Sequence, residues 1–343
     1  MKRMTIKDVA AHAGVSAATV SRALSNEPTV SPDIALRVRE AASALNYRPS
    51  MMARSLTSSR TGLVALVVGR LHNPFDAQLV EELSKSLQHS GRRLLVVPAD
   101  YGENDPGAMV ALDYQVDGVI VAAGLLAKET AGRFVALGVP VVIYGRTLDA
   151  PGVDCIVADN VPAARMIGQL FRSAGVTRAM YVRHARKTFS DDERGAGFTE
   201  GLGDAISMQV LECSRANARE FALSALSSEG RPDGVFCAND VLAHGVMEAA
   251  VQLGLEIPRQ LMIAGVDDID MSASPFFNLT TLHQSPAEIA EWIATRLGER
   301  LADPEMEATT FRVPLRLKLR GTTPLFQNIG GIAAVSARRK DKP

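Results

Sequence analysis

Residues 5–26 read TIKDVAAHAGVSAATVSRALSN, and this stretch predicts two short helices joined by a tight turn. Thr5 stands where a helix cap is expected, and Asp8 follows it at the spacing of a capping box. Gly14 then offers the positive φ that a turn between two helices needs. Ser16 is the expected cap of the second helix. Two helices and a glycine turn within about twenty residues form the pattern of a helix-turn-helix.

A third helix completes the head of the chain. Ser31 is its expected cap and Pro32 its first residue, which is a strong start signal. In a helix-turn-helix the second helix enters the major groove of DNA. There Arg22 can pair with a guanine, while Ala17 and Ala18 offer only apolar contact. The alternative is a three-helix bundle whose polar face is merely solvated.

The charge distribution favours contact between this head and DNA. Residues 1–60 hold nine basic and four acidic side chains, a net of +5. The rest of the 343-residue chain holds 28 basic and 34 acidic side chains, a net of −6. A basic head on an acidic body is expected when only the head touches phosphates, although a charge bias by itself is more often a solvated face.

Residues 4–56 resemble the DNA-binding head of the LacI/GalR family of regulators almost position for position, because the stretch quoted above is followed by VSPDIALRVREAASALNYRPSMMARSL. A looser likeness continues to about residue 321. The resemblance implies that the DNA sequence is read by Ala17, Ala18 and Arg22. It implies that the phosphate backbone is held by Thr5, Ser16, Thr19, Ser21 and Asn26. Family members often carry larger polar side chains at the first two reading positions, so the two alanines leave the operator sequence open.

Residues 49–61 are the expected connection between head and body. Ser50 follows a proline and can cap a short helix over 51–57, which by itself is marginal in water. The resemblance implies a hinge helix that orders on DNA, with Leu56 as a wedge in the minor groove and Ala53 beside the bases. The alternative is a plain linker in which Leu56 covers the next domain.

From residue 62 onward, short β-branched runs alternate with amphipathic helices, which predicts parallel sheets covered by helices on both faces. About 260 residues of this pattern suggest two sheets. The strands are expected at Leu63–Val68, Leu94–Val97, Gly118–Val121, Val139–Tyr144, Ile156–Ala158, Ala179–Arg183, Gly234–Cys237 and Leu261–Val266. The helices are expected at Asp76–Ser90, Glu129–Leu137, Val161–Ser173, Asp191–Leu202, Ala218–Ser227, Asp240–Leu253 and Pro286–Leu301. This region resembles the periplasmic-binding-protein-like sensor of the same family, in which two lobes flank a cleft.

Ligand sites in open parallel sheets lie beyond the carboxyl ends of the strands. After the first expected strand come Asn73, Phe75 and Asp76, in a turn similar to the family's NPFF turn. The ring can stack on a sugar or base, and the polar groups can hydrogen-bond to it. The alternative is a helix cap with Phe75 in the core. Arg146 follows the fourth strand, where a plain surface arginine is the alternative.

Three motifs of the family place further candidates in the second lobe. The arginine of R-x-x-GF corresponds to Arg194, for which an ion pair on the helix surface is the alternative. The asparagine of F-x-x-ND corresponds to Asn239, and the first aspartate of G-[FY]-D-D corresponds to Asp267. A guanidinium facing a carboxylate suits polyols, because sugar hydroxyls both donate and accept hydrogen bonds. Gln284 lies in the last expected crossover, at the edge of the cleft.

The stretch His184–Thr188 is unusually basic for the margin of a cleft. Together with Arg70 and Arg146 it favours an anionic effector, such as a sugar acid or a sugar phosphate. The alternative, to which we give equal weight, is that these are solvated surface charges. Tight binding of a neutral sugar alone would exclude the anionic effector.

Other classes of protein find little support in the sequence. No nucleophile elbow, P-loop or HExxH motif is present, and the stretch GAGFTEGLG at 195–203 lacks the preceding strand of a dinucleotide fingerprint. We therefore expect no catalytic residue, cofactor or metal. The three cysteines are scattered, and the apolar runs are too short to span a membrane. The N-terminus does not read as a signal peptide, which argues against a secreted transport protein and for the cytoplasm.

We therefore expect an all-α helix-turn-helix head at 1–48, a hinge at 49–61, a two-lobed α/β sensor with parallel sheets at 62–321 and a disordered tail at 322–343. The tail carries no leucine heptads, so a homodimer is expected in place of a tetramer. The expected function is repression of transcription from a roughly palindromic operator in double-stranded DNA. A sugar, sugar acid or sugar phosphate between the lobes would control the affinity for DNA allosterically.

Overall fold

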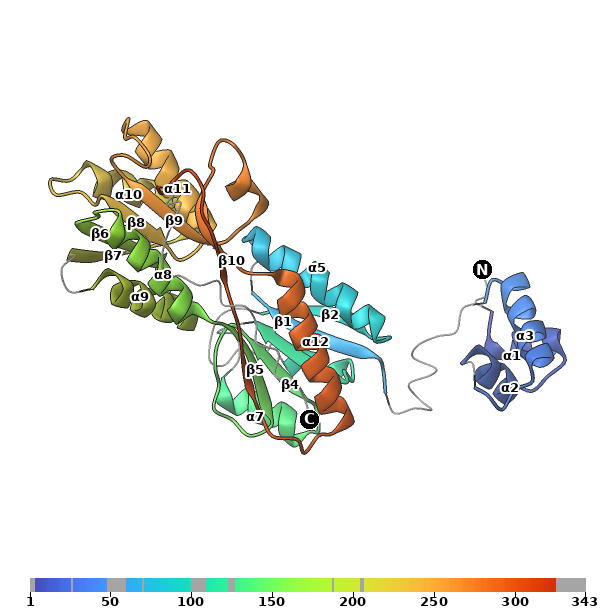
Figure 1. Ribbon diagram of the computed structural model, residues 1–343. Coiled ribbons are helices and arrows are strands. Elements are labelled where there is room, and N and C mark those ends of the chain that lie inside the picture. The colour runs from blue at the N-terminus through green and yellow to red at the C-terminus, as the bar shows by residue number, and fades with distance from the viewer. Residues whose placement is uncertain are drawn as a thin grey trace, which may run out of the picture. The chain divides into compact units, whose positions relative to one another are not determined.

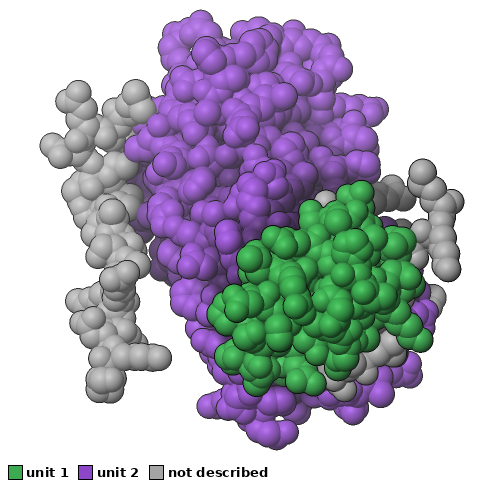
Figure 2. All heavy atoms as spheres, turned by 90° about the vertical axis from the view of Figure 1, so that its right-hand side faces the viewer, with its two compact units in different colours: residues 1–62 green, residues 63–343 purple. Residues whose placement is uncertain are grey.

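The computed structural model describes residues 4–25, 27–47, 60–69, 71–99, 109–122, 127–186, 188–203 and 207–324. The chain divides into two units between Gly62 and Leu63, which are coloured separately in Figure 2. The described residues of the first unit form three helices, and the second unit contains two α/β lobes (Figure 1). The expected fold class, a helix-turn-helix head with a two-lobed α/β body, is confirmed.

The three helices of the first unit are α1 (Ile6–Ala13), α2 (Ala17–Leu24) and α3 (Pro32–Ala44). Helix α1 starts as the sequence predicts, since Asp8 accepts hydrogen bonds of 2.7 Å from both the backbone N–H and the hydroxyl of Thr5. It ends at Gly14, whose φ of 65° lies in the left-handed region that glycine tolerates. Each helix buries one apolar face in a shared core built around Val9, Val20 and Val38.

The first lobe of the body is a six-stranded parallel sheet of order β11-β5-β4-β3-β1-β2. Its strands are β1 (Leu63–Val68), β2 (Arg93–Pro98), β3 (Gly118–Ala122), β4 (Val141–Tyr144), β5 (Val153–Ala158) and β11 (Thr310–Val313). Helices α5 (Pro74–His89) and α12 (Pro286–Ala302) cover one face, and α6 (Val110–Asp113) and α7 (Lys128–Ala136) cover the other. The central strands are apolar on both faces because both are covered.

The second lobe repeats this design with a sheet of order β12-β10-β9-β8-β6-β7. Its strands are β6 (Arg178–His184), β7 (Ser207–Cys213), β8 (Gly234–Cys237), β9 (Met262–Asp267), β10 (Thr280–His283) and β12 (Arg316–Lys318). Only β12 runs antiparallel to its neighbour. The helices are α8 (Asn160–Ser173), α9 (Phe189–Leu202), α10 (Ala218–Ser227) and α11 (Asp240–Gln252), and the 3-10 helices are η2 (Arg215–Asn217) and η3 (Asp270–Ala273).

The glycines at 195–203 belong to the packing of α9 on α8. A Cβ on Gly197 would lie 2.2 Å from the carbonyl oxygen of Val161, and one on Gly201 would lie 2.2 Å from that of Arg165. The two helix backbones are therefore in direct contact. Close packing of α9 on α8 therefore accounts for the glycine-rich stretch, and a dinucleotide-binding role is not needed to explain it.

The chain passes between the lobes three times: after β5, after β10, and between β11 and β12 (Figure 1). The return path to β11 is held by a buried charge cluster. Arg296 and Arg300 of α12 both bind the fully buried carboxylate of Asp154 in β5, at 2.9 Å and 3.1 Å. Both guanidinium groups also donate to the backbone carbonyl of Glu307, just before β11. These contacts fix the end of α12 and the start of β11 to the same lobe.

All eight expected strands are present, with shifts of up to three residues at their ends, whereas β7, β10, β11 and β12 were not predicted. The expected start of the tail at 322 was too early. Thr322 and Thr323 are buried, and the Thr322 hydroxyl accepts the backbone N–H of Thr280 and donates to the carbonyl of Ile263. The rest of the expected tail, from residue 325, lies outside the described residues, as does the expected hinge helix at 51–57.

Candidate functional site

A cavity of about 350 Å³ lies between the two lobes, at the carboxyl ends of both sheets. Helices α5, α9 and α11 begin there, because each follows a strand that ends at the cavity. Their amino-terminal N–H groups favour ligands with negative charge or with acceptor atoms. Seven of the eight effector-site residues predicted from the sequence line this cavity: Asn73, Phe75, Asp76, Arg194, Asn239, Asp267 and Gln284.

Arg146 is the eighth predicted residue, and it is not part of the cavity lining. It follows β4 as expected, but the chain turns at Gly145, whose φ is 84°. Gly145 itself lines the cavity, so the turn places the backbone there. The proposed effector site therefore does not include Arg146.

Asp267 is a buried acid of the cavity, and burial raises its pKa. Its two carboxylate oxygens accept amide hydrogen bonds of 2.7 Å from Asn73 and Gln284. The φ of Asp267 is 114°, a conformation that L residues rarely adopt. The two amides therefore hold a carboxylate at a strained end of β9, facing the cavity.

Arg194 projects from α9 and is also buried. Its Nε donates to Asn160 Oδ1 over 2.9 Å, and its Nη1 donates to the carbonyl oxygen of Ala238 over 2.6 Å. Both partners are neutral, so the ion pair on a helix surface is not what holds this side chain. Asn160 is the first residue of α8, directly after the first crossover, and it thus connects the arginine to the junction of the lobes.

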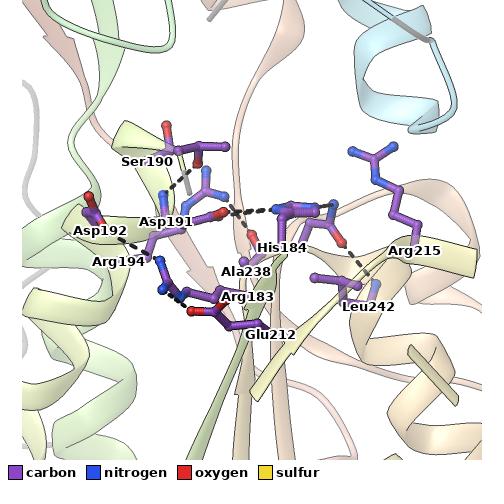
Figure 3. Close-up of polar contacts among 12 residues, drawn as sticks. Arg183, His184, Ser190, Asp191, Asp192, Arg194, Glu212, Arg215, Ala238 and Leu242 are labelled. Carbon is purple, nitrogen blue, oxygen red and sulfur yellow. Dashed lines mark hydrogen bonds and ion pairs between the residues drawn. The ribbon is translucent and has the colours of Figure 1, made fainter. Parts of the chain in front are cut away.

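His184, at the end of β6, lies between Asp191 and Asn239. Figure 3 shows the dashed contact from Asp191 to the imidazole. Nδ1 is 3.0 Å from Asp191 Oδ2, and Nε2 is 3.2 Å from Asn239 Nδ2. The Asn239 Oδ1 atom accepts the backbone N–H of Leu242 over 2.9 Å, which caps α11. A continuous hydrogen-bond network at the carboxyl end of the second sheet is thus formed by Asp191, His184, Asn239 and Leu242.

Asp76 faces this hydrogen-bond network from α5 in the first lobe. Burial raises its pKa to about 6, and nearby Asp267 acts in the same direction, while Arg215 and His184 lower it. The Arg215 guanidinium lies 4.0 Å from the Asp76 carboxylate, across the space between the lobes. Phe75 satisfies both interpretations of the sequence, because it lines the cavity and also packs into the core of the first lobe.

Other residues of the lining were not among the eight predicted, including Tyr144, His184, Arg186, Thr188, Ser190, Asp191 and Arg215. The sequence analysis considered the stretch 184–188 only as a basic margin of the cleft. Most of these lining residues follow the strands β4 and β6, and the rule about strand ends could have found them. Arg215 follows β7, a strand that was not predicted.

The described residues that we expect to contact DNA lie on α2 or at the caps of α1 and α2. Ala18 and Arg22 are exposed one turn apart on α2, whereas Ala17 is partly packed into the core. The Ser16 hydroxyl accepts the backbone N–H of Thr19 over 3.1 Å and forms a 2.8 Å hydrogen bond with its hydroxyl. Thr5 precedes α1, and Ser21 is half-buried on α2. Three predicted DNA contacts lie outside the described residues: Asn26, Ala53 and Leu56.

Two further properties concern the described part of the chain. None of its helices is long and apolar enough to cross a membrane. Its histidine, cysteine and acidic side chains form no group of three that could hold a metal ion.

Two family models match the chain. Residues 5–50 match the family described as bacterial regulatory proteins of the lacI family, and residues 169–323 match the periplasmic binding protein-like domain. The ribose operon repressor of Bacillus subtilis is 30% identical over 330 residues, which cover 93% of this chain and 98% of the repressor. The chain belongs to the LacI family. It is therefore a DNA-binding transcription regulator with an effector-binding body, as the sequence predicted, and not an enzyme.

Other members of the LacI family match over similar lengths. The sucrose operon repressor of Pediococcus pentosaceus is 27% identical over 327 residues, covering 93% of this chain and 98% of the relative. The crystal structure of the lac repressor dimer bound to operator and an anti-inducer superimposes with a TM-score of 0.82. It covers 94% of this chain and 99% of that chain at 22% identity, a likeness that concerns the fold.

Proposed function

We propose that this LacI-family chain is a cytoplasmic repressor that binds its operator as a homodimer through α1 and α2. A sugar or sugar acid, bound in the cavity between the lobes, controls the affinity for DNA. One observation carries the proposal: the cavity joins both lobes and combines donors with acceptors, as a polyol requires.

The donors and acceptors come from different elements. Arg194 and Asn239 offer N–H groups from the second lobe, while Asp76 offers a carboxylate from the first. Phe75 and Tyr144 supply apolar surface on which a sugar ring can stack. Two relatives named above repress operons for the sugars ribose and sucrose, which agrees with this chemistry.

Sugar acids belong among the candidates because three arginines line the cavity: Arg186, Arg194 and Arg215. Arginine binds carboxylates and phosphates through paired N–H groups. The cavity also holds three aspartates, Asp76, Asp191 and Asp267, so its formal charge does not by itself select an anion. A neutral sugar and its acid must therefore be compared directly.

Control of DNA binding follows from thermodynamic linkage. An effector that binds one arrangement of the lobes more tightly shifts the chain toward that arrangement. The lac repressor, which shares this fold, is a dimer on its operator, and a two-fold dimer predicts a palindromic site. A coupling of about 1–3 kcal/mol would change operator affinity by roughly 5- to 150-fold.

The test is a thermal-shift screen of the full chain with D-ribose, sucrose, D-gluconate and ribose 5-phosphate. A ligand of the folded body raises the melting temperature with concentration. Each compound that does so is then tested for its effect on operator binding by fluorescence anisotropy. Arg194→Ala should abolish the shift, whereas Arg259→Ala, an exposed arginine outside the cavity, should keep it. A shift that persists in Arg194→Ala would contradict the assignment of the site.

The assignment of DNA binding to the first unit and of effector binding to the second can be tested separately. Removal of residues 1–60 should abolish operator binding and leave effector affinity nearly unchanged. Leu56→Ala should weaken operator binding and reduce DNA bending, as expected for a wedge in the minor groove. Operator binding by the shortened chain, or unchanged bending by Leu56→Ala, would refute the respective role.

A further inference from the structure

His184 contacts Asp191 in the first turn of α9 and Asn239, the cap of α11, whereas the sequence analysis considered it only as part of a basic stretch at the margin of the cleft. On the basis of the proposed function, we propose that His184 is a positioning residue for effector recognition. It holds the Asn239 side chain so that the amide N–H₂ group offers the effector a hydrogen-bond donor. The effector atom at this position is then an acceptor, such as a hydroxyl, ether, carbonyl or carboxylate oxygen.

The orientation of the Asn239 amide follows from its two contacts. Its oxygen accepts the backbone N–H of Leu242 over 2.9 Å and so caps α11. Its nitrogen lies 3.2 Å from His184 Nε2. Exchange of the amide oxygen and nitrogen would place an N–H₂ group against the N–H of Leu242 and would lose the cap. The nitrogen therefore faces the histidine.

The tautomer of His184 follows in turn. Because the Asn239 nitrogen can only donate, Nε2 of His184 must accept and carries no proton. The ring proton is then on Nδ1, which donates to Asp191 over 3.0 Å. Asp191 is buried, and its backbone is held in place because its N–H donates to the Thr188 hydroxyl and its carbonyl accepts the Tyr181 hydroxyl. The donor and the acceptor are thereby assigned for each hydrogen bond that links Asp191, His184 and Asn239.

One donor of Asn239 remains for the cavity. A carboxamide nitrogen has two N–H groups, and His184 takes one of them. Both residues line the cavity, so the second N–H is available to an effector there. The oxygen is turned toward the backbone of α11, so the N–H₂ group is the part of the amide that points away from the helix. An effector atom that meets this nitrogen must therefore be a hydrogen-bond acceptor.

Protonation of His184 would reverse this arrangement. An imidazolium donates from both nitrogens, so its Nε2–H would oppose the N–H₂ of Asn239. Either the contact breaks, or the amide turns over and the cap of α11 is lost. Charged groups on several elements face the cavity beside the ring: Asp191 and Arg194 on α9, Asp76 on α5, Asp267 on β9, Arg186 after β6 and Arg215 after β7. Recognition of an effector acceptor through the Asn239 N–H therefore requires the neutral ring of His184.

The first test measures the tautomer and needs no effector. Long-range ¹H–¹⁵N spectra of the full chain with labelled histidine report which ring nitrogen carries the proton, and the spectrum of His184→Gln assigns the signal. We expect the Nδ1–H tautomer for His184 at pH 7.5. A proton on Nε2, alone or together with one on Nδ1, would overturn the proposal.

The second test measures binding of D-ribose and D-gluconate by calorimetry at pH 8. His184→Gln keeps an acceptor for Asn239, whereas His184→Leu has none. We expect His184→Gln to bind like the wild type. His184→Leu should bind roughly 3- to 10-fold more weakly, the effect of one hydrogen bond. Unchanged affinity in His184→Leu, or an equal loss in His184→Gln, would overturn the proposal.

His283 provides a matched control. Its Nδ1 lies 3.0 Å from Asp268, and its side chain is 27% exposed, compared with 23% for His184, but it does not line the cavity. His283→Gln and His283→Leu should therefore both leave effector binding unchanged. If neither probe binds the wild-type chain, the choice of effectors in the proposed function fails. The tautomer measurement still decides the role of His184.

Discussion

The side-chain amide of Asn73 donates a hydrogen bond of 2.7 Å to the carboxylate of Asp267, although 194 positions separate the two residues. Asn73 caps α5 in the first lobe, and Asp267 ends β9 in the second. Gln284, in the crossover after β10, donates to the other carboxylate oxygen. One buried acid thus connects both lobes and a crossover at the wall of the cavity.

Asn73→Ala is expected to lower the free energy of unfolding by about 2–4 kcal/mol. It removes a helix cap, worth about 1 kcal/mol, and a hydrogen bond to a carboxylate, worth about 1.5–3 kcal/mol. Ser285→Ala is the matched control, since Ser285 caps α12 through the N–H of Glu288 without bonding to Asp267. It should lose only about 1 kcal/mol. Urea unfolding measures both, and equal losses would show that the bond between the lobes contributes nothing.

Asp76 is expected to make the stability of the body fall with rising pH. Burial raises its pKa from 3.8 to about 6, so the folded chain keeps a proton that the unfolded chain has released. Its contribution is fully present below pH 3.8 and is lost as the pH rises through about 6. Because the side chain keeps 37% exposure, solvent reduces the effect. Denaturant unfolding between pH 4 and pH 7 should show a steeper decline for the wild type than for Asp76→Asn. Parallel curves would contradict the raised pKa.

Gly201→Ala is expected to destabilise the second lobe by about 1–3 kcal/mol. The new Cβ would meet the carbonyl oxygen of Arg165 in α8 at 2.2 Å, and a helix backbone cannot yield locally. Gly132→Ala, in α7, is the matched control, because no atom lies within 4 Å of its Cβ position. It should gain up to about 1 kcal/mol from helix propensity. Thermal unfolding distinguishes the two variants. A stable Gly201→Ala would mean that α8 and α9 are not in backbone contact.

Asp154→Ala is expected to cost about 3–5 kcal/mol of stability, because it leaves the buried guanidinium groups of Arg296 and Arg300 without their carboxylate. Glu200→Ala breaks an ion pair with Arg165 that is exposed on both sides, and it should cost at most about 1 kcal/mol. Urea unfolding of both variants tests the difference. Similar costs would show that the buried cluster is not what fixes β11.

Arg22→Ala is expected to weaken operator binding by about 1–3 kcal/mol, as for the loss of a paired contact to guanine. Arg37 is likewise exposed but lies on α3, so Arg37→Ala should retain most of the affinity for the same operator. The measurement is fluorescence anisotropy on an operator recovered by selection from random DNA. A loss that is equal on random DNA would assign Arg22 to the phosphates instead of the bases.

The sequence identified candidate residues of the cavity through a rule about parallel sheets and through motifs of the family. Apolar runs such as Leu63–Val68 marked the central strands, and the turn after the first strand led to Asn73. The resemblance to the family led to Asn239 and Asp267, and all three residues line the cavity. Arg146 follows its strand equally well, but the turn at Gly145 keeps it out of the lining.

Most of the missed lining residues follow β4 and β6, which the sequence did predict, but Arg215 was missed because its strand carries little signal. β7 is an edge strand with mostly exposed or half-buried residues, so it lacks an apolar run. Because β7 was not predicted, Arg215 after it was not considered. β11 and β12 are short and mostly exposed or half-buried, whereas the equally short β8 is buried throughout and was predicted.

The sequence by itself determined the helix-turn-helix and the two-sheet body, since capping residues, glycine turns and apolar spacing act over a few neighbouring residues. Only the tertiary structure decided that His184 meets Asp191 and Asn239. The same is true of the contact between Asn73 and Asp267. Such contacts depend on where the three crossovers place one sheet against the other, and no spacing along the chain encodes that position.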